Sequence, residues 1–434
     1  MSEAIFVSLS GVDGGVFESQ VMELGESFRS MGVEFRYLLF EGLRTGVRSG
    51  ARLKQQLADL SRRFDARLEL RYLPGPLSRP GLRLAAHYLA RAAQSVASGR
   101  VLVQARGAPA ACAALEAKRR VGAIAVVYDA RSDEAAEARL EAGTATTRAG
   151  RSRWERRANR LEVLQQHAAA GADHVLAVSK PLRDRLCTLA EISTARVSVV
   201  PCCVNPTRFV RPLSTRQSTR RRLHLEDRFV FVYSGSLQLW QIPDRIAALM
   251  TSVQAQLPAA HLLVLTRDRT TASRFFGNLL KQDSATIQDC PFETVGDYLA
   301  AADAALLLRE NDAVNRVACP VKFAEYQVSG LPVIATPGIG DVSDYVLQTG
   351  HGLLIRLDET PQQQASQIVR ALNEGRWRDK TAIVSDAVKM FSRESYRGVY
   401  HEILSALGVS LGCVTNEPNA GEIAAREECS RYGA

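Results

Sequence analysis

The chain has 434 residues, 46% of them hydrophobic and 23% charged, and a formal net charge of +9. This length exceeds that of one ordinary hydrophobic core, so we expect about two domains. No run approaches the roughly 20 apolar residues of a membrane-spanning helix, and the opening MSEAIFVSLSG lacks the pattern of a signal peptide. These features argue against a helical membrane protein and predict an unprocessed cytoplasmic one.

The predicted elements begin with a strand at 5–9, a glycine loop at 11–15 and a helix at 17–31. Apolar runs and segments with helical periodicity then alternate along the first half of the chain. Strands are predicted at 34–40, 68–73, 100–104 and 123–128, and helices at 50–64, 81–98 and 108–120. Alternation at this spacing indicates a parallel sheet with helices on both faces.

A long polar helical stretch is predicted at 132–170. It is followed by a predicted strand at 174–179, a helix that begins at Pro181 and a further strand at 197–200. The prolines that follow, together with the arginine-rich stretch 214–228, have the composition of a linker. We therefore predict the domain boundary in this region.

The alternation restarts in the second half of the chain. Strands are predicted at 229–233, 261–266, 285–288 and 304–308, and helices at 243–256, 293–302, 361–374 and 394–407. The predicted domains are a Rossmann-like domain at 1–205, a second Rossmann-like domain at 206–393, a terminal helix at 394–408 that packs on the first domain, and a mobile tail at 409–434.

The segment PVKFAEYQVSGLPVIATPGIGD, at 320–341, predicts a ligand site. A proline opens a short helix that carries Lys322 and Glu325, Gly330 ends it, and a buried strand with a glycine-bearing loop follows. The start of such a helix offers backbone N–H groups to a phosphate, and a carboxylate can accept hydrogen bonds from sugar hydroxyls. The pattern therefore indicates a nucleotide-sugar site.

Basic residues gather in three stretches, at 44–63, 148–160 and 216–222. Such an excess suits nucleic acid, an anionic membrane surface or a phosphorylated substrate. Aromatic residues make up only 6% of the chain and do not interleave with the arginines, which disfavours nucleic acid. The first two clusters suit a membrane surface that holds a lipid-linked acceptor, and a solvated face is the alternative. The eight cysteines contain no CxxC pair, which favours reduced thiols over disulfides or a metal site.

Four stretches resemble the family 4 retaining glycosyltransferases of the GT-B fold. They are LSGVDGGVFESQVMEL, ADHVLAVSKPLRDRL with SVVPCCVNPTRF, FVYSGSLQLW, and PVKFAEYQVSGLPVIAT with GHGLLI. The resemblance implies an α/β fold with two Rossmann-like, doubly wound parallel-sheet domains facing a cleft. The second domain would hold a nucleoside diphosphate sugar and the first a glycan or lipid-linked acceptor, without a metal or other cofactor.

The resemblance also assigns roles to residues of this chain. Glu325 is similar to the glutamate that binds the ribose hydroxyls, and Gly235 and Ser236 are similar to the loop under the diphosphate. Gly14 and Gly15 resemble the loop of the first domain that faces the donor phosphate.

Two departures from the family pattern stand out. Val317 lies where the family has a second acidic residue, with Asn311, Asp312 or Asn315 as substitutes, and Gln238 and Gln241 lie where it has a basic pair. The basic residues able to compensate for that pair are Arg267, Arg269, Arg316 and Lys322.

Polar residues also follow two neighbouring strands of the first half. Gln104 and Arg106 follow one strand and are predicted on the acceptor side, while Asp129 and Arg131 follow the next. Ligands bind at the carboxyl edge of a parallel sheet, so Asp129 and Arg131, with Lys322, are the predicted catalytic residues, although the first two could instead form an ordinary loop pair.

The sequence thus predicts a retaining, metal-independent hexosyltransferase, with association at the inner face of the plasma membrane as a further expectation. A catalytically inactive glycosyltransferase-like partner protein is the alternative. An epimerase lacks a suitable acid and base, and a nicotinamide dehydrogenase is disfavoured because GVDGG is not G-x-G-x-x-G. The nucleotide, sugar, acceptor and oligomeric state are left open.

Overall fold

The computed structural model describes residues 2–9, 15–96, 99–377 and 379–409. Within these residues the chain forms two compact units. The first runs to Pro201 and resumes at Arg393, and the second is Cys202–Ser392. These divisions lie within a few residues of the predicted boundaries at 205 and 393. Beyond Val409, the tail predicted to be mobile lies outside the described residues.

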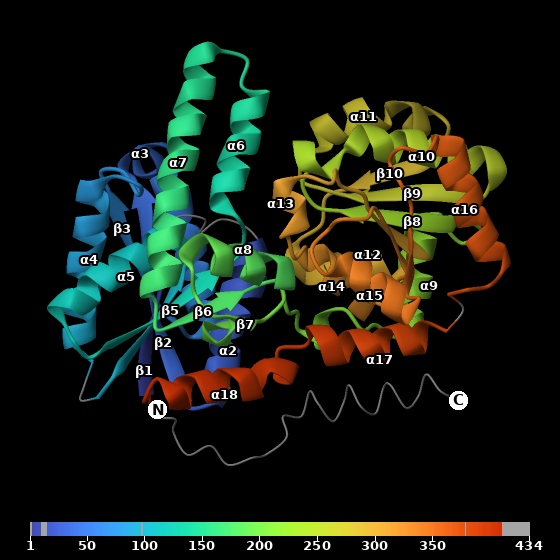
Figure 1. Ribbon diagram of the computed structural model, residues 1–434. Coiled ribbons are helices and arrows are strands. Elements are labelled where there is room, and N and C mark those ends of the chain that lie inside the picture. The colour runs from blue at the N-terminus through green and yellow to red at the C-terminus, as the bar shows by residue number, and fades with distance from the viewer. Residues whose placement is uncertain (1, 10–14, 97–98, 378, 410–434) are drawn as a thin grey trace. The chain divides into compact units, whose positions relative to one another are not determined.

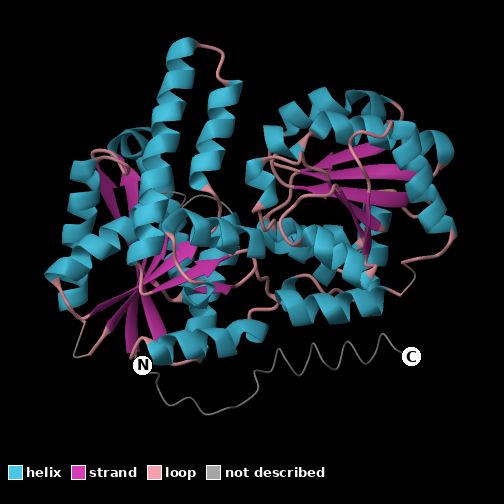
Figure 2. Cartoon of the chain, viewed as in Figure 1, coloured by secondary structure: helices cyan, strands magenta, loops and turns pink. Residues whose placement is uncertain are grey.

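The first unit is built on a parallel sheet whose described strands follow the order β3-β2-β1-β4-β5-β6-β7, with helices on both faces (Figures 1 and 2). The strands are β1 (Ser2–Ser8), β2 (Val33–Gly42), β3 (Arg67–Leu73), β4 (Val101–Arg106), β5 (Ile124–Ala130), β6 (His174–Ala177) and β7 (Val197–Val199). Ile5, Phe6 and Val7 of β1 are fully buried, as expected for a strand that is covered on both faces.

The helices of this unit include one π-helical turn directly after the first glycine loop. They are α1 (Gly15–Phe17), the π-helix η1 (Glu18–Met22), α2 (Glu23–Ser30), α3 (Leu43–Phe64), α4 (Arg79–Gln94), α5 (Ala108–Arg120), α6 (Glu134–Thr144), α7 (Arg148–Gly171), α8 (Lys180–Ala190), η2 (Thr194–Arg196), η6 (Glu394–Tyr396) and α18 (Arg397–Ala406). The terminal helix α18 packs on α2, where the rings of Tyr400 and Phe28 lie 4.9 Å apart.

The stretch at 132–170, predicted as one long helical segment, forms two helices. Helices α6 and α7 pair as a hairpin that projects from the first unit (Figure 1). The chain breaks at Thr147, whose hydroxyl accepts a hydrogen bond of 3.0 Å from the amide of Gly150 and so caps α7.

The second unit has a parallel sheet with the strand order β10-β9-β8-β11-β12-β13 among its described residues. The strands are β8 (Phe229–Ser234), β9 (Ala260–Leu265), β10 (Ala285–Gln288), β11 (Ala304–Leu307), β12 (Val333–Ala335) and β13 (Gly352–Leu354). The helices are η3 (Pro206–Arg208), α9 (Leu213–Arg222), η4 (Leu239–Gln241), α10 (Pro243–Gln256), α11 (Arg269–Lys281), η5 (Phe292–Thr294), α12 (Val295–Ala300), α13 (Ala313–Arg316), α14 (Val321–Val328), α15 (Val342–Thr349), α16 (Pro361–Asn373) and α17 (Lys380–Phe391). Both sheets are therefore parallel, as the alternation predicted.

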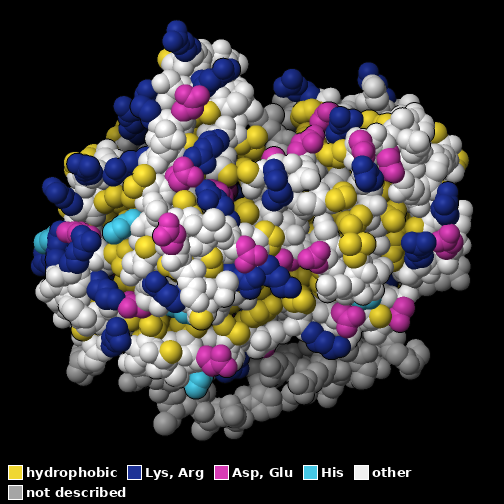
Figure 3. Space-filling model, viewed as in Figure 1, with side chains coloured by type: hydrophobic (Ala, Val, Ile, Leu, Met, Phe, Trp, Pro, Cys, Tyr) yellow, Lys and Arg dark blue, Asp and Glu magenta, His cyan; other side chains and the backbone are white. Residues whose placement is uncertain are grey.

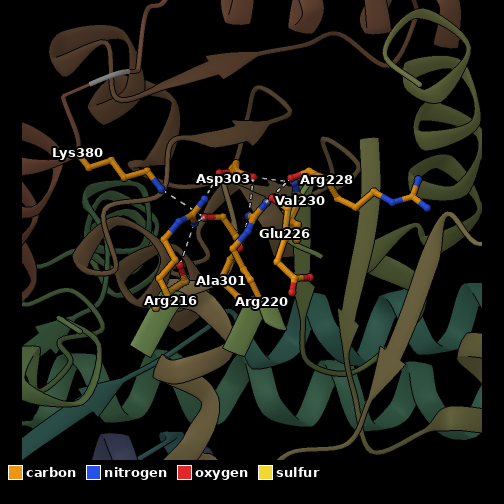
Figure 4. Close-up of polar contacts among 10 residues, drawn as sticks. Arg216, Arg220, Glu226, Arg228, Val230, Ala301, Asp303 and Lys380 are labelled. Atoms are coloured by element: carbon orange, nitrogen blue, oxygen red, sulfur yellow. Dashed lines mark hydrogen bonds and ion pairs between the residues drawn. The ribbon is translucent and has the colours of Figure 1, made fainter. Parts of the chain in front are cut away.

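The interpretation of the arginine-rich stretch 214–228 as part of a linker is wrong. Most of it forms α9, from which Arg216 and Arg220 reach Asp303 at 2.6 and 3.2 Å (Figure 4). Both guanidinium groups also donate to carbonyls just after α12, and Asp303 accepts the amide of Val230 at 2.8 Å. One helical turn separates the two arginines, so they share a face and attach α9 to the second sheet.

Among the described residues, no helix combines the length and the apolar character needed to cross a membrane. The same residues hold no group of three or more His, Cys, Asp or Glu side chains suited to a metal ion.

Candidate functional site

The glycine loop after β8 is shaped by a lysine side chain. Gly235 has a φ of 118°, its amide donates to the carbonyl of Leu265 at 2.7 Å, and a Cβ at this position would overlap the end of the Lys322 side chain. Only glycine tolerates both this backbone and this approach. Ser236 is exposed, and its carbonyl accepts a hydrogen bond from the hydroxyl of Tyr233.

Lys322, in the first turn of α14, lies over this loop among neutral groups. Its Nζ is 3.3 Å from the amide oxygen of Gln241, 3.5 Å from the Tyr233 hydroxyl and 4.6 Å from the centroid of that ring. Burial, with a further contribution from Arg309, lowers the pKa of Lys322 to about 7, and Glu325 opposes that shift. The side chain therefore changes charge near neutral pH.

Glu325 lies on the same helix and is 6% exposed. Burial raises the pKa of the Cys290 thiol to about 11; Asp289 and the Glu325 carboxylate add to this shift, and Arg267 opposes it. Glu325 and Arg267 therefore both lie near this thiol. Lys322 donates to Gln241 and Tyr233 rather than to this carboxylate, so the two residues do not form the surface pair that their spacing allowed.

The other predicted basic residues of this unit are exposed. Arg267 follows β9, and Arg316 ends α13 with its Nε 3.3 Å from the carbonyl of Asp312. The charged groups that shift the pKa of Lys322 are Arg309 and Glu325. The structure thus brings together Gly235, Lys322 and Glu325, and leaves Arg267 and Arg316 at the surface.

Sequence reasoning missed Arg309, which is 7% exposed and lies just past the end of β11. Its Nη1 donates to the amide oxygen of Asn315 at 3.2 Å. Its position in the sequence could have marked it as a candidate, because a cation directly after a parallel strand lies at the edge of the sheet where ligands bind.

The loop that precedes α14 uses its polar residues internally. Asp312 caps α13 by accepting the amide of Asn315 at 2.8 Å, and Asn311 lies against Gly338. Val317, where the family has an acidic residue, is 7% exposed. Of the three polar residues considered as substitutes for this acid, Asn315 is the one that accepts a hydrogen bond from Arg309.

The first unit brings its four predicted polar residues to the carboxyl edge of its sheet. Arg106 and Asp129 are register partners across β4 and β5, with Nη1 and Oδ2 3.7 Å apart. Arg131 lies 3.5 Å from the other oxygen of Asp129 and donates to Gln20 at 2.9 Å. Gln104 is 1% exposed, and its Nε2 has no hydrogen-bond partner among the described residues.

The glycine loop of the first unit is described only in part. Gly14 lies outside the described residues, and Gly15 begins α1. In the π-helix that follows, Glu18 accepts two hydrogen bonds from Arg63, at 3.1 and 2.5 Å. π-helical turns occur often at functional sites, which agrees with the position of this one beside the predicted loop.

A pocket of about 90 Å³ in the second unit contains none of the predicted residues. It is lined by Phe209, Arg216, Val328 and Lys380 among others, at the opposite edge of the sheet from Gly235. Lys380 and Arg216 both donate to the carbonyl of Ala302, so their charges stabilise the chain just after α12.

Comparison with known proteins finds a family match over the first unit. The model of the family described as Glycosyltransferase Family 4 matches residues 14–208. This match spans most of the first unit. No curated protein sequence matches the chain.

Solved structures of glycosyltransferases share the whole fold. HepE of Anabaena in complex with UDP is 15% identical, with a TM-score of 0.69 over 94% of this chain and 100% of its own. HepE in complex with UDP-glucose gives a TM-score of 0.68 at the same identity and coverage. Sucrose-phosphate synthase from Thermosynechococcus elongatus is 16% identical (TM-score 0.66, 94% and 100% coverage). WaaG, a glycosyltransferase involved in lipopolysaccharide biosynthesis, is 14% identical (TM-score 0.60, 95% and 100%). The predicted GT-B fold is confirmed.

Proposed function

We propose that this protein transfers a sugar from a nucleoside diphosphate sugar to a glycan or lipid-linked acceptor with retention of configuration. The observation that carries this proposal is the meeting of Gly235, Lys322 and Glu325 at the carboxyl edge of the second sheet. HepE, which has the same fold, is known in complex with UDP and UDP-glucose, so a uridine nucleotide is the first donor to test.

In this mechanism the second unit binds the donor. The carboxylate of Glu325 accepts hydrogen bonds from the ribose hydroxyls, and the Gly235 loop and Lys322 lie along the diphosphate. Cations and N–H groups stabilise the negative charge that develops on the leaving diphosphate. The acceptor hydroxyl attacks the same face of the sugar and its proton passes to the leaving phosphate, so no metal is required.

The first unit binds the acceptor in this proposal. Asp129 is 3% exposed and is flanked by Arg106 and Arg131. Their guanidinium groups orient the carboxylate, which suits a role in binding acceptor hydroxyls.

The ribose contact gives a direct test. E325Q is expected to weaken UDP binding about 10-fold or more, because a charged hydrogen bond to a hydroxyl contributes about 1.5–3 kcal/mol. The loss of affinity caused by E325Q should be smaller for 2′-deoxy-UDP, because this ligand lacks one of the two ribose hydroxyls. E310Q, which changes an exposed glutamate of the same unit, is the matched control. A wild-type protein that binds no UDP-, GDP- or ADP-sugar in calorimetry would contradict the proposed function.

A non-catalytic partner protein remains the second candidate, because Val317 is apolar where the family has an acid. Turnover distinguishes the two candidates. The transferase releases free UDP from UDP-sugar in the presence of acceptor or slowly with water, whereas the partner protein binds nucleotide without releasing UDP.

We also propose that the first unit associates with an anionic membrane surface. Arg44, Arg48 and Arg52 recur every fourth residue along α3 and are exposed, and Val47 between them is 89% exposed. Lys and Arg side chains also line the projecting α6–α7 hairpin (Figure 3). Sedimentation with phosphatidylglycerol vesicles should fall for R44E/R48E and persist for R274E/K281E, the same charge change at exposed positions of α11. Equal binding by both variants would contradict the proposal.

A further inference from the structure

Arg309 is held rigidly by a single side chain on the neighbouring strand segment. Its amide donates to Thr336 Oγ1 at 2.9 Å, and the same hydroxyl donates to the carbonyl of Arg309 at 2.6 Å. Thr336 directly follows β12, which pairs with β11. The backbone that carries this guanidinium is therefore fixed at the carboxyl edge of the sheet, as a preorganised binding group requires.

The guanidinium itself has little compensation for its burial. Nη1 donates to the amide oxygen of Asn315, Nε is buried without a hydrogen-bond partner, and no carboxylate of the described residues lies within 4.0 Å. Asp312 is nearby, but its two oxygens accept from the amide and the side chain of Asn315. Burying a cation without an anionic partner costs several kcal/mol, and proteins retain such groups where they bind a ligand.

Lys322 is partly buried and lies near Arg309, whose charge acts on it. Its hydrogen-bond partners, Gln241 and Tyr233, are neutral, and Arg309 and Glu325 are the charged groups that act on it. Tyr326 is buried on the same helix, and its hydroxyl accepts the amide of Ser234 at 2.8 Å, next to Gly235. Two cations thus lie near Glu325, the proposed ribose contact, and one of them, Lys322, lies against the Gly235 loop.

We propose that Arg309 and Lys322 together bind the diphosphate of the donor. They would supply the positive charge of the basic pair that the family has after β8, where this chain has Gln238 and Gln241. The inference rests on the proposed function for the identity of the ligand. Arg309, rather than Arg267 or Arg316, is then the compensating cation, since those two are exposed whereas Arg309 is buried and acts electrostatically on Lys322. Burial lowers the pKa of Arg309, and an anion that contacts it would restore the stability of its charged form.

Inorganic pyrophosphate is the most direct probe because it carries the diphosphate without base or sugar. Calorimetry of the full chain should show R309M binding pyrophosphate and UDP about 10- to 100-fold more weakly than wild type, as expected for losing a charged hydrogen bond. R274M and R370M remove exposed cations of the same unit, on α11 and α16, and should change either affinity less than threefold. R309K, which keeps the charge without the planar fork, should fall between wild type and R309M.

Folding of the variant is checked by its melting temperature without ligand. R309M removes a buried cation that lacks an ionic partner, so this temperature should equal or exceed that of wild type. If R309M does not fold, R309Q, which retains a hydrogen-bond donor for Asn315, carries the same prediction. Wild-type affinity for pyrophosphate in a folded Arg309 variant would overturn the inference.

The outcomes also separate this inference from the proposed function. A wild-type protein that binds pyrophosphate through Arg309 but binds no nucleotide sugar would overturn the proposed function and leave the anion site. If wild type and R309M bind UDP-sugar with equal affinity, the role of Arg309 alone would be overturned. Failure of wild type to bind pyrophosphate, UDP and UDP-sugar would overturn both.

Discussion

The ammonium nitrogen of Lys322 lies 4.6 Å from the centroid of the Tyr233 ring and 3.5 Å from its hydroxyl. A buried cation–π contact of this kind stabilises the charged lysine by about 2 kcal/mol. Burial and the neighbouring Arg309 act in the opposite direction and prevail, because the pKa of Lys322 falls to about 7. The charge of this side chain is therefore easily changed by a bound anion.

Binding of UDP is expected to weaken as the pH rises from 7.5 to 9. Above a pKa of about 7 the free protein carries mostly neutral Lys322, so a diphosphate that stabilises the charged form must take up a proton. The dissociation constant should rise by up to about tenfold per pH unit. Calorimetry in buffers with different ionisation enthalpies measures the proton uptake directly.

K322M is the control for this pH dependence, and its UDP affinity should be weak and flat over the same range. The lysine also affects the stability of the free protein. Its pKa of about 7 is below the unfolded value of 10.5, so the unfolded chain binds more protons between those values. Stability relative to K322M should therefore increase as the pH rises from 7 to 10.5. If the stabilities of wild type and K322M change in parallel over this pH range, the lowered pKa of Lys322 would be contradicted.

Alanine at Gly235 should disrupt the donor site. The backbone there has a φ of 118°, which costs a non-glycine residue about 1–3 kcal/mol, and the new Cβ would displace Lys322. We expect G235A to lower the free energy of unfolding by that amount and to reduce UDP affinity.

Gly277 provides the matched control, because it lies inside α11 and a Cβ there meets nothing within 4 Å. G277A should stabilise the protein by about 0.5–1 kcal/mol and leave UDP affinity unchanged. Chemical denaturation measures both effects. Unchanged UDP affinity in G235A would show that Lys322 does not depend on this loop.

Replacing Asp129 by asparagine should destabilise the first unit. The carboxylate is 3% exposed between Arg106 and Arg131, and neutralising it leaves two partly buried guanidinium groups with less compensation. A loss of about 3 kcal/mol is expected. E116Q, which removes the exposed partner of Arg119 and Arg120, should cost less than about 0.5 kcal/mol, and similar losses in both variants would contradict the prediction.

Replacing Asp303 by asparagine should destabilise the second unit. Asp303 receives Arg216, Arg220 and the amide of Val230, so D303N weakens three contacts that attach α9 to the second sheet (Figure 4). The unfolding free energy should fall by about 3 kcal/mol, while D358N, at an exposed pair with Arg356, should have little effect. A folded D303N protein with wild-type stability would show that α9 is held by other contacts.

Much of the fold and part of the site could be predicted from the sequence. Continuous apolar runs such as Ile5–Val7 are found in strands buried on both faces, and the PVKFAEYQ pattern led correctly to a helix that holds Lys322 and Glu325. The break at Thr147 and the buried role of α9 were not predicted, because local composition there is polar throughout.

The sequence by itself determined the alternation of most strands and helices, the two parallel sheets and the helix that carries Lys322 and Glu325. These features depend on periodicity and on cap residues, which act over a few positions. Only the tertiary structure decided that Arg309 is buried while Arg267 and Arg316 are exposed, although all three look alike in the sequence. Burial depends on strand pairing and crossovers, which bring Tyr233, Arg309, Lys322 and Thr336 together from distant parts of the chain.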